Sequence, residues 1–201
     1  MNIAILLLAA GNSQRYKLHS GEHKLLVPIK GKPLIDYALH SAISTGLDTY
    51  LVTQPEEIAL HRRVAAERLI TYASRGIGES IAIGVKHTQQ YDGWVVALAD
   101  MPFIRPDTYL TVAEQLHNVD CVRPCYQHRY GHPVGFAKAL YPHLTALQGD
   151  IGARHLFQQT PYVTLPTEDQ GCIIDIDTPD SLARYLSLFP ERDGSLDSRT
   201  Q

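Results

Sequence analysis

Apolar residues occur along the first half of this chain in short runs that alternate with amphipathic stretches. The run Ile3–Leu8 is uninterrupted, which is typical of a strand buried on both faces of a parallel sheet, so we expect it to be the central strand. The segments after it predict a helix from Pro33 to Gly46, a strand at 48–53, a helix at 55–68 and a strand at 69–72. This alternation predicts a parallel sheet with right-handed crossovers, whose ligand loops follow the carboxyl ends of the strands.

The second half continues with apolar strands and ends in a polar tail. Its pattern predicts a strand at 93–100, a helix at 106–117, a strand at 120–126 with a return to 136, a strand within 158–165, a strand ending near 177 and a helix from 179 to about 189. We therefore predict a single α/β domain over residues 1–190, with a mostly parallel sheet flanked by helices. Residues 191–201 lack periodicity and predict a disordered tail.

Composition narrows the class of protein. The 201 residues suffice for one full-sized domain, and 44% apolar with 19% charged residues is ordinary for a globular protein. A net charge of -3 gives no excess of cations for binding a nucleic-acid backbone. Three cysteines without paired spacing imply neither a disulfide framework nor a zinc site. The N-terminal apolar run is too short to span a bilayer, so we expect a cytoplasmic protein without nucleic-acid or membrane partners.

The turn after the first strand has the chemistry of an anion site. Ala9, Ala10 and Gly11 are small, so backbone N–H groups can approach a ligand closely, while Ser13 offers a hydroxyl donor. Arg15 and Lys24 add positive charge, which suits a polyphosphate. The loop matches neither standard phosphate-binding fingerprint, and an ordinary turn with two surface cations is the alternative interpretation.

A carboxylate follows the second near-continuous apolar strand. Asp100 comes at the end of the run from Gly93, at the edge of the sheet where the first loop also lies. A hard cation between phosphates needs such an oxygen ligand, so Asp100 is the leading candidate ligand of Mg²⁺. A cap for the next segment is the alternative. A zinc site on His128, His132 and His155 is disfavoured, because their spacing fits no common site.

These motifs carry a resemblance to a known family. The stretch Leu8-Ala9-Ala10-Gly11-x-Ser13-x-Arg15, with Lys24 before a Leu-Leu pair, resembles the signature of the MobA-like nucleotidyltransferases. The resemblance implies a Rossmann-like fold of the nucleotide-diphospho-sugar transferase type. It makes Leu98–Pro102 a metal-binding motif and adds Asp177, from the final Asp-x-Asp-Thr-Pro motif, as a second metal ligand. It also implies that Arg15, Lys24 and Asp100 are catalytic and that residues 8–11 and Ser13 bind the nucleotide.

Three further segments acquire roles from the same resemblance. Gly78 and Ser80, in a Gly-x-Gly-x-Ser stretch, would lie near the base, although a simple helix N-cap is equally compatible. Two glycine-containing loops resemble those of molybdenum cofactor cytidylyltransferases and would line the acceptor side. Their acceptor-binding residues would be Arg129, His132, Asp150 and Arg154, while a tight turn and a helix start are the structural alternatives.

The resemblance implies an activity. An acceptor phosphate would attack the α-phosphate of a nucleoside triphosphate, with CTP favoured over GTP because Leu-Ala-Ala-Gly replaces the Leu-Ala-Gly-Gly of guanylyl-transferring relatives. The acceptor would be a molybdopterin-type cofactor, and a molybdoenzyme or its chaperone a further partner. A sugar-phosphate nucleotidylyltransferase and a non-catalytic cofactor carrier are the alternatives. The chain departs from the family in the longer segment between Arg15 and Lys24, which leaves open whether Lys17 or Lys24 reaches the triphosphate.

Overall fold

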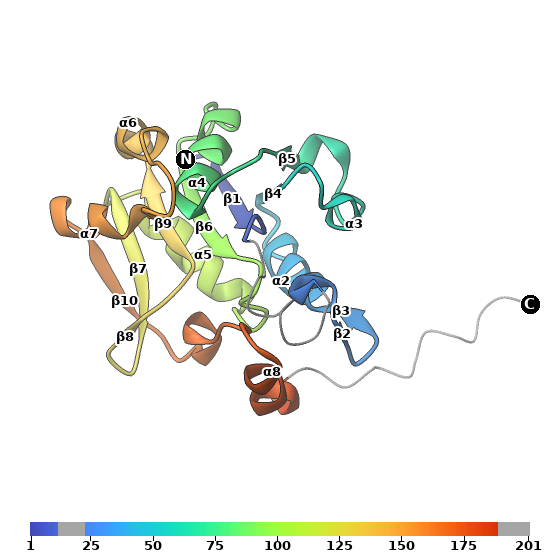
Figure 1. The fold of residues 1–201 in the computed structure, drawn as a ribbon. Helices are drawn as coiled ribbons and strands as arrows, with labels where there is room; N and C mark the ends of the chain where they lie inside the picture. Colours follow the sequence, from blue (N-terminus) through green and yellow to red (C-terminus); the bar gives the residue numbers. More distant parts are fainter. Residues whose placement is uncertain (12–22, 189–201) are drawn as a thin grey trace, which may run out of the picture.

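The computed structural model describes residues 1–11 and 23–188, which form a mixed sheet with helices on both faces (Figure 1). The strand order is β10-β7-β9-β6-β1-β4-β5, with β8 paired to β7 outside this path. The strands are β1 (Ile3–Leu8), β4 (Asp48–Thr53), β5 (Leu69–Thr71), β6 (Gly93–Leu98), β7 (Cys121–Tyr126), β8 (Arg129–Tyr130), β9 (Val134–Ala137) and β10 (Val163–Pro166). A separate hairpin pairs β2 (Pro28–Ile29) with β3 (Lys32–Pro33).

The strands β1, β4, β5 and β6 pair in parallel, and so do β7 and β10. Between these groups β9 runs antiparallel to both of its neighbours, which makes the sheet mixed. The prediction of a mostly parallel α/β sheet is confirmed. The strand β1 is interior, bonded to β6 and β4 along its two edges, so its carboxyl end opens between two parallel partners.

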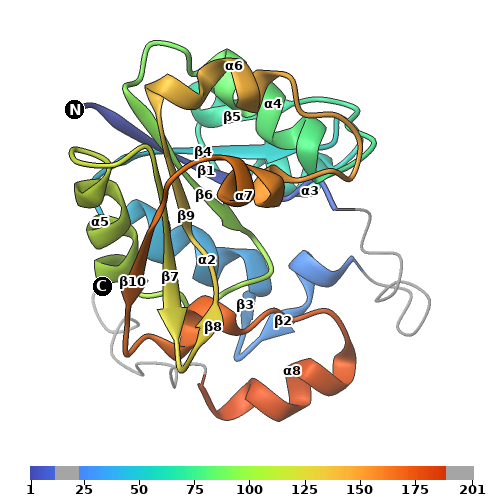
Figure 2. The same ribbon diagram turned by 90° about the vertical axis from the view of Figure 1, so that its left-hand side faces the viewer.

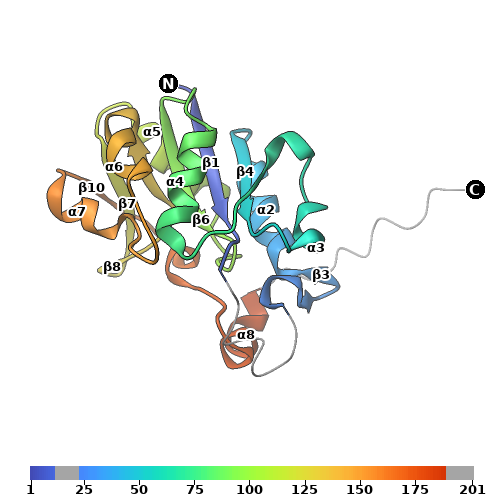
Figure 3. The same ribbon diagram turned by 45° about the horizontal axis from the view of Figure 1, so that its top comes forward.

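Helices cover both faces of the sheet (Figures 2 and 3). The main helices are α2 (Leu34–Ile43), α4 (Ile77–His87), α5 (Pro106–Gln115), α6 (Tyr141–Thr145), α7 (Leu156–Gln159) and α8 (Pro179–Tyr185). Successive side chains of a strand point to opposite faces. Accordingly Ile5 and Leu7 of β1 pack in one apolar cluster with α2 and α5, whereas Ala4 and Leu6 pack in a second cluster with α4, α6 and α7.

Two predicted elements are wrong. The expected helix at 55–68 is only α3 (Ile58–His61) followed by a 3-10 turn (Ala66–Arg68). Leu60 is the one helical residue of this segment that is buried, and a helix without an apolar face gains little from packing. The expected strand ending near 177 is also missing, because a 3-10 turn (Gln170–Ile173) and a non-repetitive stretch replace it among the described residues.

Smaller differences concern the ends of elements. Pro33 lies in β3 and precedes α2 rather than occupying its first turn. The strand β6 ends at Leu98, so Asp100 lies in the turn after it. The α8 helix begins as predicted, because Thr178 and Ser181 form a capping box and Pro179 occupies the first helical position. The described residues include no helix long and apolar enough to cross a membrane. Residues 191–201, predicted as a tail, lie outside the described part of the chain.

Candidate active site

Lys24, Asp100 and Asp177 meet at the carboxyl edge of the sheet. Lys24 Nζ donates hydrogen bonds to Asp100 Oδ2 and to Asp177 Oδ1, each at 2.7 Å. The lysine side chain is 10% exposed, whereas those of Asp100 and Asp177 are 22% and 37% exposed. The structure therefore brings together the cation and both carboxylates that the sequence motifs single out. The lysine side chain is thus the least exposed of the three.

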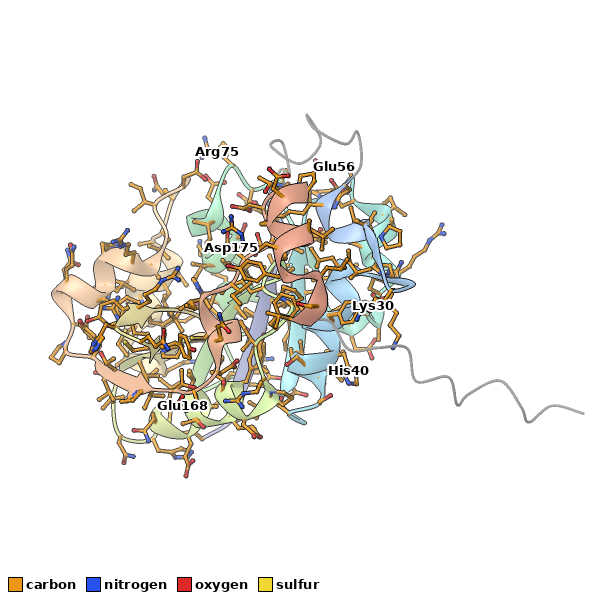
Figure 4. All side chains as sticks on the ribbon, turned by 90° about the horizontal axis from the view of Figure 1, so that it is seen from below. Lys30, His40, Glu56, Arg75, Glu168 and Asp175 are labelled. Atoms are coloured by element: carbon orange, nitrogen blue, oxygen red, sulfur yellow. The ribbon has the colours of Figure 1, made fainter. Side chains whose placement is uncertain are left out.

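Each of these side chains is fixed by local structure. Lys24 opens a 3-10 turn (Lys24–Leu26), where His23 Nδ1 accepts a hydrogen bond from the Leu25 amide. The carbonyl group of Asp100 accepts a hydrogen bond from the Ile176 amide at 2.9 Å, which ties the turn after β6 to the C-terminal segment. Asp177 donates its amide hydrogen to Ser181 Oγ, so the capping box of α8 orients it. Figure 4 views this edge from below, with Asp175 near its centre.

The electrostatics of the cluster follow from these contacts. Burial by itself lowers the pKa of Lys24, but Asp100 and Asp177 outweigh it and hold the pKa above the ordinary 10.5. Burial and a hydrogen bond with Asp177 raise the pKa of Asp175, and the negative charges nearby act in the same direction. Asp100 Oδ1 is buried and has no hydrogen-bond partner in the described chain, so this carboxylate oxygen can still accept a hydrogen bond or bind a cation. The cluster is thus a carboxylate site with spare acceptor capacity.

The first turn is held by two residues that sequence reasoning missed. The Ala9 amide bonds to the Val52 carbonyl group, and Gln54 Nε2 donates to the Ala10 carbonyl group at 3.0 Å. Gln54 also donates to the Ser74 carbonyl group at 2.9 Å. The signal for Gln54 was its position directly after a parallel strand, but a neutral polar residue has no distinctive motif. Among the described residues, an added Cβ at Gly11 would meet nothing within 4 Å.

The start of α4 is closely packed against a glycine loop. Ser80 is buried, and its hydroxyl lies 2.9 Å from Ser74 Oγ and 3.1 Å from the Gly76 carbonyl group. Its hydrogen bonds within the protein position the first turn of α4. Gly78 donates its amide hydrogen to the Gly149 carbonyl group, and an added Cβ at Gly78 would lie 2.3 Å from the Ile151 carbonyl oxygen. Glycine is therefore needed at Gly78 for this packing.

The residues expected on the acceptor side lie on separate elements. Arg129, on β8, and Arg154, in a 3-10 turn (Ala153–His155), are exposed. Asp150 lies against Gly76, where an added Cβ would be 2.3 Å from Asp150 Oδ1. His132 is near Asp100, and burial lowers its pKa although the Asp100 charge acts against this, so its imidazole is neutral near pH 7. Within the described chain no hydrogen bond or ion pair joins these four residues to one another.

The C-terminal segment is fastened at a buried carboxylate. Asp169 Oδ2 accepts from the Arg105 amide at 2.8 Å and from Thr108 Oγ1 at 2.6 Å, and so caps α5 from outside that helix. The following Gly171 would bring an added Cβ within 2.0 Å of the Phe103 carbonyl oxygen. On its other side the Cys172 carbonyl group accepts from the His132 amide at 2.8 Å. This segment is therefore held between the turn after β6 and the hairpin that carries His132.

Some sequence-based expectations fall outside the described residues. Ser13, Arg15 and Lys17 belong to residues 12–22, which the structure does not describe. For the rest of the chain, His128, His132 and His155 form no group that could hold a metal, and neither does any set of three or more His, Cys, Asp or Glu residues in the described ranges. Asp100 and Asp177 still fit a cation, since one oxygen of each already converges on the Lys24 ammonium.

This fold and site define a class: an α/β protein in which a lysine and two carboxylates meet at the carboxyl edge of a mostly parallel sheet. The model of the MobA-like NTP transferase domain matches residues 5–164. The chain belongs to this family of nucleotidyltransferases. The resemblance inferred from the sequence is confirmed.

Three curated relatives align with most of the chain. The purine catabolism protein PucB of Bacillus subtilis is 29% identical over 192 residues, which are 87% of this chain and 91% of that protein. The molybdenum cofactor cytidylyltransferase of Escherichia coli is 24% identical over 194 residues, covering 94% and 98%. A probable molybdenum cofactor guanylyltransferase of Aquifex aeolicus is 28% identical over 189 residues, covering 90% and 89%. The chain is thus related to enzymes described with different nucleotide donors.

A solved structure supports the fold. The Rv0371c protein of Mycobacterium tuberculosis, in a complex with manganese, matches with a TM-score of 0.79 and 23% identity. The match covers 94% of this chain and 100% of that one. The α/β architecture is therefore shared with a solved protein.

Proposed function

We propose that this protein transfers a CMP group from CTP to a phosphorylated acceptor, a molybdopterin-type cofactor, and releases pyrophosphate. The observation that carries the proposal is the convergence of Lys24, Asp100 and Asp177 at the carboxyl edge of the sheet, where β1 also ends. An oxygen of the acceptor phosphate attacks the α-phosphorus in line, and the bond to the β-phosphate oxygen breaks. No side chain needs to act as a nucleophile in this transfer.

The residues of the chain contribute mainly position and charge. The backbone around Ala10 and Gly11, with Ser13 and Arg15, binds the β- and γ-phosphates, and Lys24 neutralises charge at the α-phosphate. The start of α4, at Gly78 and Ser80, supports the base, with Ser80 acting through the packing of that helix turn. Preorganised donors of this kind stabilise the charge that develops on the phosphate oxygens during transfer.

Asp100 and Asp177 would hold a Mg²⁺ ion. The fit rests on their converging oxygens and on the unpartnered Asp100 Oδ1, which leaves a carboxylate lone pair available. When bound, Mg²⁺ would supply positive charge to the phosphate oxygens. The manganese in the Rv0371c structure belongs to that protein and supports the choice of a divalent cation here.

The acceptor would bind on the side of β8 and of the loop before α7. Arg129 and Arg154 are exposed cations without an ion-pair partner in the described chain, which suits an anionic acceptor. His132 and Asp150 would complete this side. His132 is neutral near pH 7, so it can donate or accept a hydrogen bond without adding charge.

CTP is proposed over GTP because Ala10 follows Ala9 in the first turn, giving Leu-Ala-Ala-Gly. Guanylyl-transferring relatives have Leu-Ala-Gly-Gly at this place. The cytidylyl- and guanylyl-transferring relatives are both similar to this chain, so donor choice is the part that requires measurement first. Calorimetry with CTP, GTP, ATP and UTP, with and without Mg²⁺, is the test. We expect a preference for CTP that Mg²⁺ strengthens in the wild type and not in Asp100→Ala. Preference for GTP would instead indicate guanylyl transfer, and no binding of any nucleotide would contradict the proposed activity.

The transfer itself is tested by pyrophosphate release. With CTP, Mg²⁺ and molybdopterin cofactor, we expect pyrophosphate in proportion to the acceptor supplied. Release with a sugar phosphate but not with molybdopterin would assign the acceptor loops to a different substrate class.

A further inference from the structure

Lys24 binds the same two carboxylate groups that the proposed function assigns to Mg²⁺. Its ammonium group lies 2.7 Å from an oxygen of each carboxylate, which are the distances of strong charge-assisted hydrogen bonds. The side chain of Lys24 is also the least exposed of the three, at 10%. Lys24 is therefore seated between the two carboxylates.

Charge makes simultaneous occupancy of the site unfavourable. The two carboxylates balance the two charges of a divalent cation, so the ammonium of Lys24 would lose the two charges that it now contacts. Like charges a few ångströms apart in a partly buried site repel strongly, because solvent screens them poorly. A triphosphate removes this conflict, since it brings several negative charges and oxygen acceptors that can take the ammonium group.

The number of protein ligands points in the same direction. Asp100 and Asp177 are carboxylates in a region where the described chain contains no group of three potential metal ligands. Mg²⁺ is commonly bound by one or two carboxylates together with substrate phosphates, and it requires six ligands in near-octahedral geometry. The protein alone supplies a minority of these, and a nucleotide would supply more.

We propose that Lys24 keeps the metal site closed until a nucleotide enters: the ammonium and the divalent cation compete for Asp100 and Asp177, and the triphosphate draws Lys24 away. The inference rests on the proposed function in taking these two carboxylates as the metal ligands. It goes beyond that function in assigning Lys24 two successive partners, first the carboxylates and then the phosphates. Metal and nucleotide consequently bind with positive coupling, because each favours the release of Lys24 from the two carboxylates.

The test measures Mn²⁺ binding to the full chain without nucleotide or acceptor. Free Mn²⁺ is followed by electron paramagnetic resonance for the wild type, Lys24→Met and Lys24→Gln. We expect both variants to bind Mn²⁺ at least about tenfold more tightly than the wild type, because the competing charge is gone. Lys32→Met is the matched control: Lys32 is exposed, so this variant loses the same charge away from the carboxylates and is expected to behave as the wild type.

Two results would overturn the proposal. One is Mn²⁺ affinity in the folded Lys24 variants that is equal to or below that of the wild type. The other comes from the wild type alone and does not depend on the folding of any variant: Mn²⁺ should increase acetylation of the Lys24 amine, read by mass spectrometry, while leaving Lys32 unchanged. Protection of Lys24 that persists when Mn²⁺ is bound would contradict the competition. Neither readout uses CTP, so a failure of cytidylyl transfer is recognised separately by the pyrophosphate assay.

Discussion

Lys24 Nζ lies 2.7 Å from Asp177 Oδ1, although 153 residues separate them in the chain. Asp177 also lies beyond residue 164, where the match to the family model ends. The C-terminal segment thus contributes a carboxylate to the candidate site. Its position depends on Asp169 and Gly171, which fasten the segment before it crosses the carboxyl edge of the sheet.

Replacement of Asp100 should abolish catalysis without unfolding the protein. Asp100→Asn keeps the size and polarity of the side chain but removes the charge that faces Lys24 and the cation. We expect pyrophosphate release to fall at least about 100-fold, as when preorganised charge is removed from an active site. Asp120→Asn is the control, because Asp120 is exposed at the start of β7. Wild-type turnover in Asp100→Asn at ordinary Mg²⁺ concentrations would refute the assignment.

The exposed arginines should act on the acceptor alone. Arg129→Ala and Arg154→Ala each remove a positive charge from the proposed acceptor side, so we expect KM for the phosphorylated acceptor to rise about tenfold or more. The dissociation constant of CTP should stay unchanged in calorimetry. Arg62→Ala removes an exposed arginine on the opposite part of the domain, after α3, and is expected to change neither quantity. Weaker CTP binding in Arg129→Ala would place that residue in the donor site instead.

Gly131 should be intolerant of a side chain. An added Cβ would lie 2.1 Å from the Cys172 carbonyl oxygen, so Gly131→Ala must displace backbone atoms. We expect a loss of about 1–3 kcal/mol in the free energy of unfolding, the usual cost of overpacking. Urea denaturation measures this loss. Gly11→Ala is the matched control, since its Cβ would meet nothing within 4 Å and its stability should equal that of the wild type.

The end of the sheet opposite the site should contribute acid sensitivity. A hydrogen bond from Tyr91, and then the ion pair with Arg68, lower the pKa of Asp48 below its ordinary 3.8. A carboxylate with a lowered pKa stabilises the folded state above the unfolded pKa, and this stabilisation is lost as pH falls through the folded pKa.

Asp48→Asn should therefore be less stable than the wild type near pH 6, by up to about 1 kcal/mol because the ion pair is partly exposed. The difference should be smaller at a second pH well below 3.8, because the stabilisation is lost as pH falls through the lowered pKa of Asp48. Urea denaturation at the two pH values measures this change. A difference that stays constant with pH would show that Asp48 acts through packing and not through its charge.

The strand bounds were predicted most accurately where both faces of the strand are buried. The bounds of β1 and β4 agree with the expected ones, since a strand buried on both faces is apolar at successive positions. The helix predicted over residues 55–68 was wrong. The composition of this segment favours a helix, but Leu60 is the one helical residue in it that packs in the core. The stretch around Ile174 and Ile176 is apolar like a strand, but both side chains are buried in the helix-covered core without joining the sheet.

The charged residues of the candidate site stand in recognisable motifs, whereas its neutral residues do not. Asp100 and Asp177 stand in motifs that the resemblance identified, whereas Gln54 and Ser74 carry no motif and reveal their role only through hydrogen bonds to the first turn and to one another. The two-partner contact of Lys24 could not be predicted either. It depends on the relative placement of three loops that are distant in sequence.

The close packing of Gly131 and the Cys172 carbonyl group also limits how this protein can be re-engineered. The hairpin that would face the acceptor and the segment that carries Asp177 fit together with no space between them. A hairpin transplanted from a relative with another acceptor would need the matching C-terminal segment as well. Exchange of acceptor specificity in this fold therefore requires a pair of segments to be moved as one module, with the carboxylate that would hold the metal included in it.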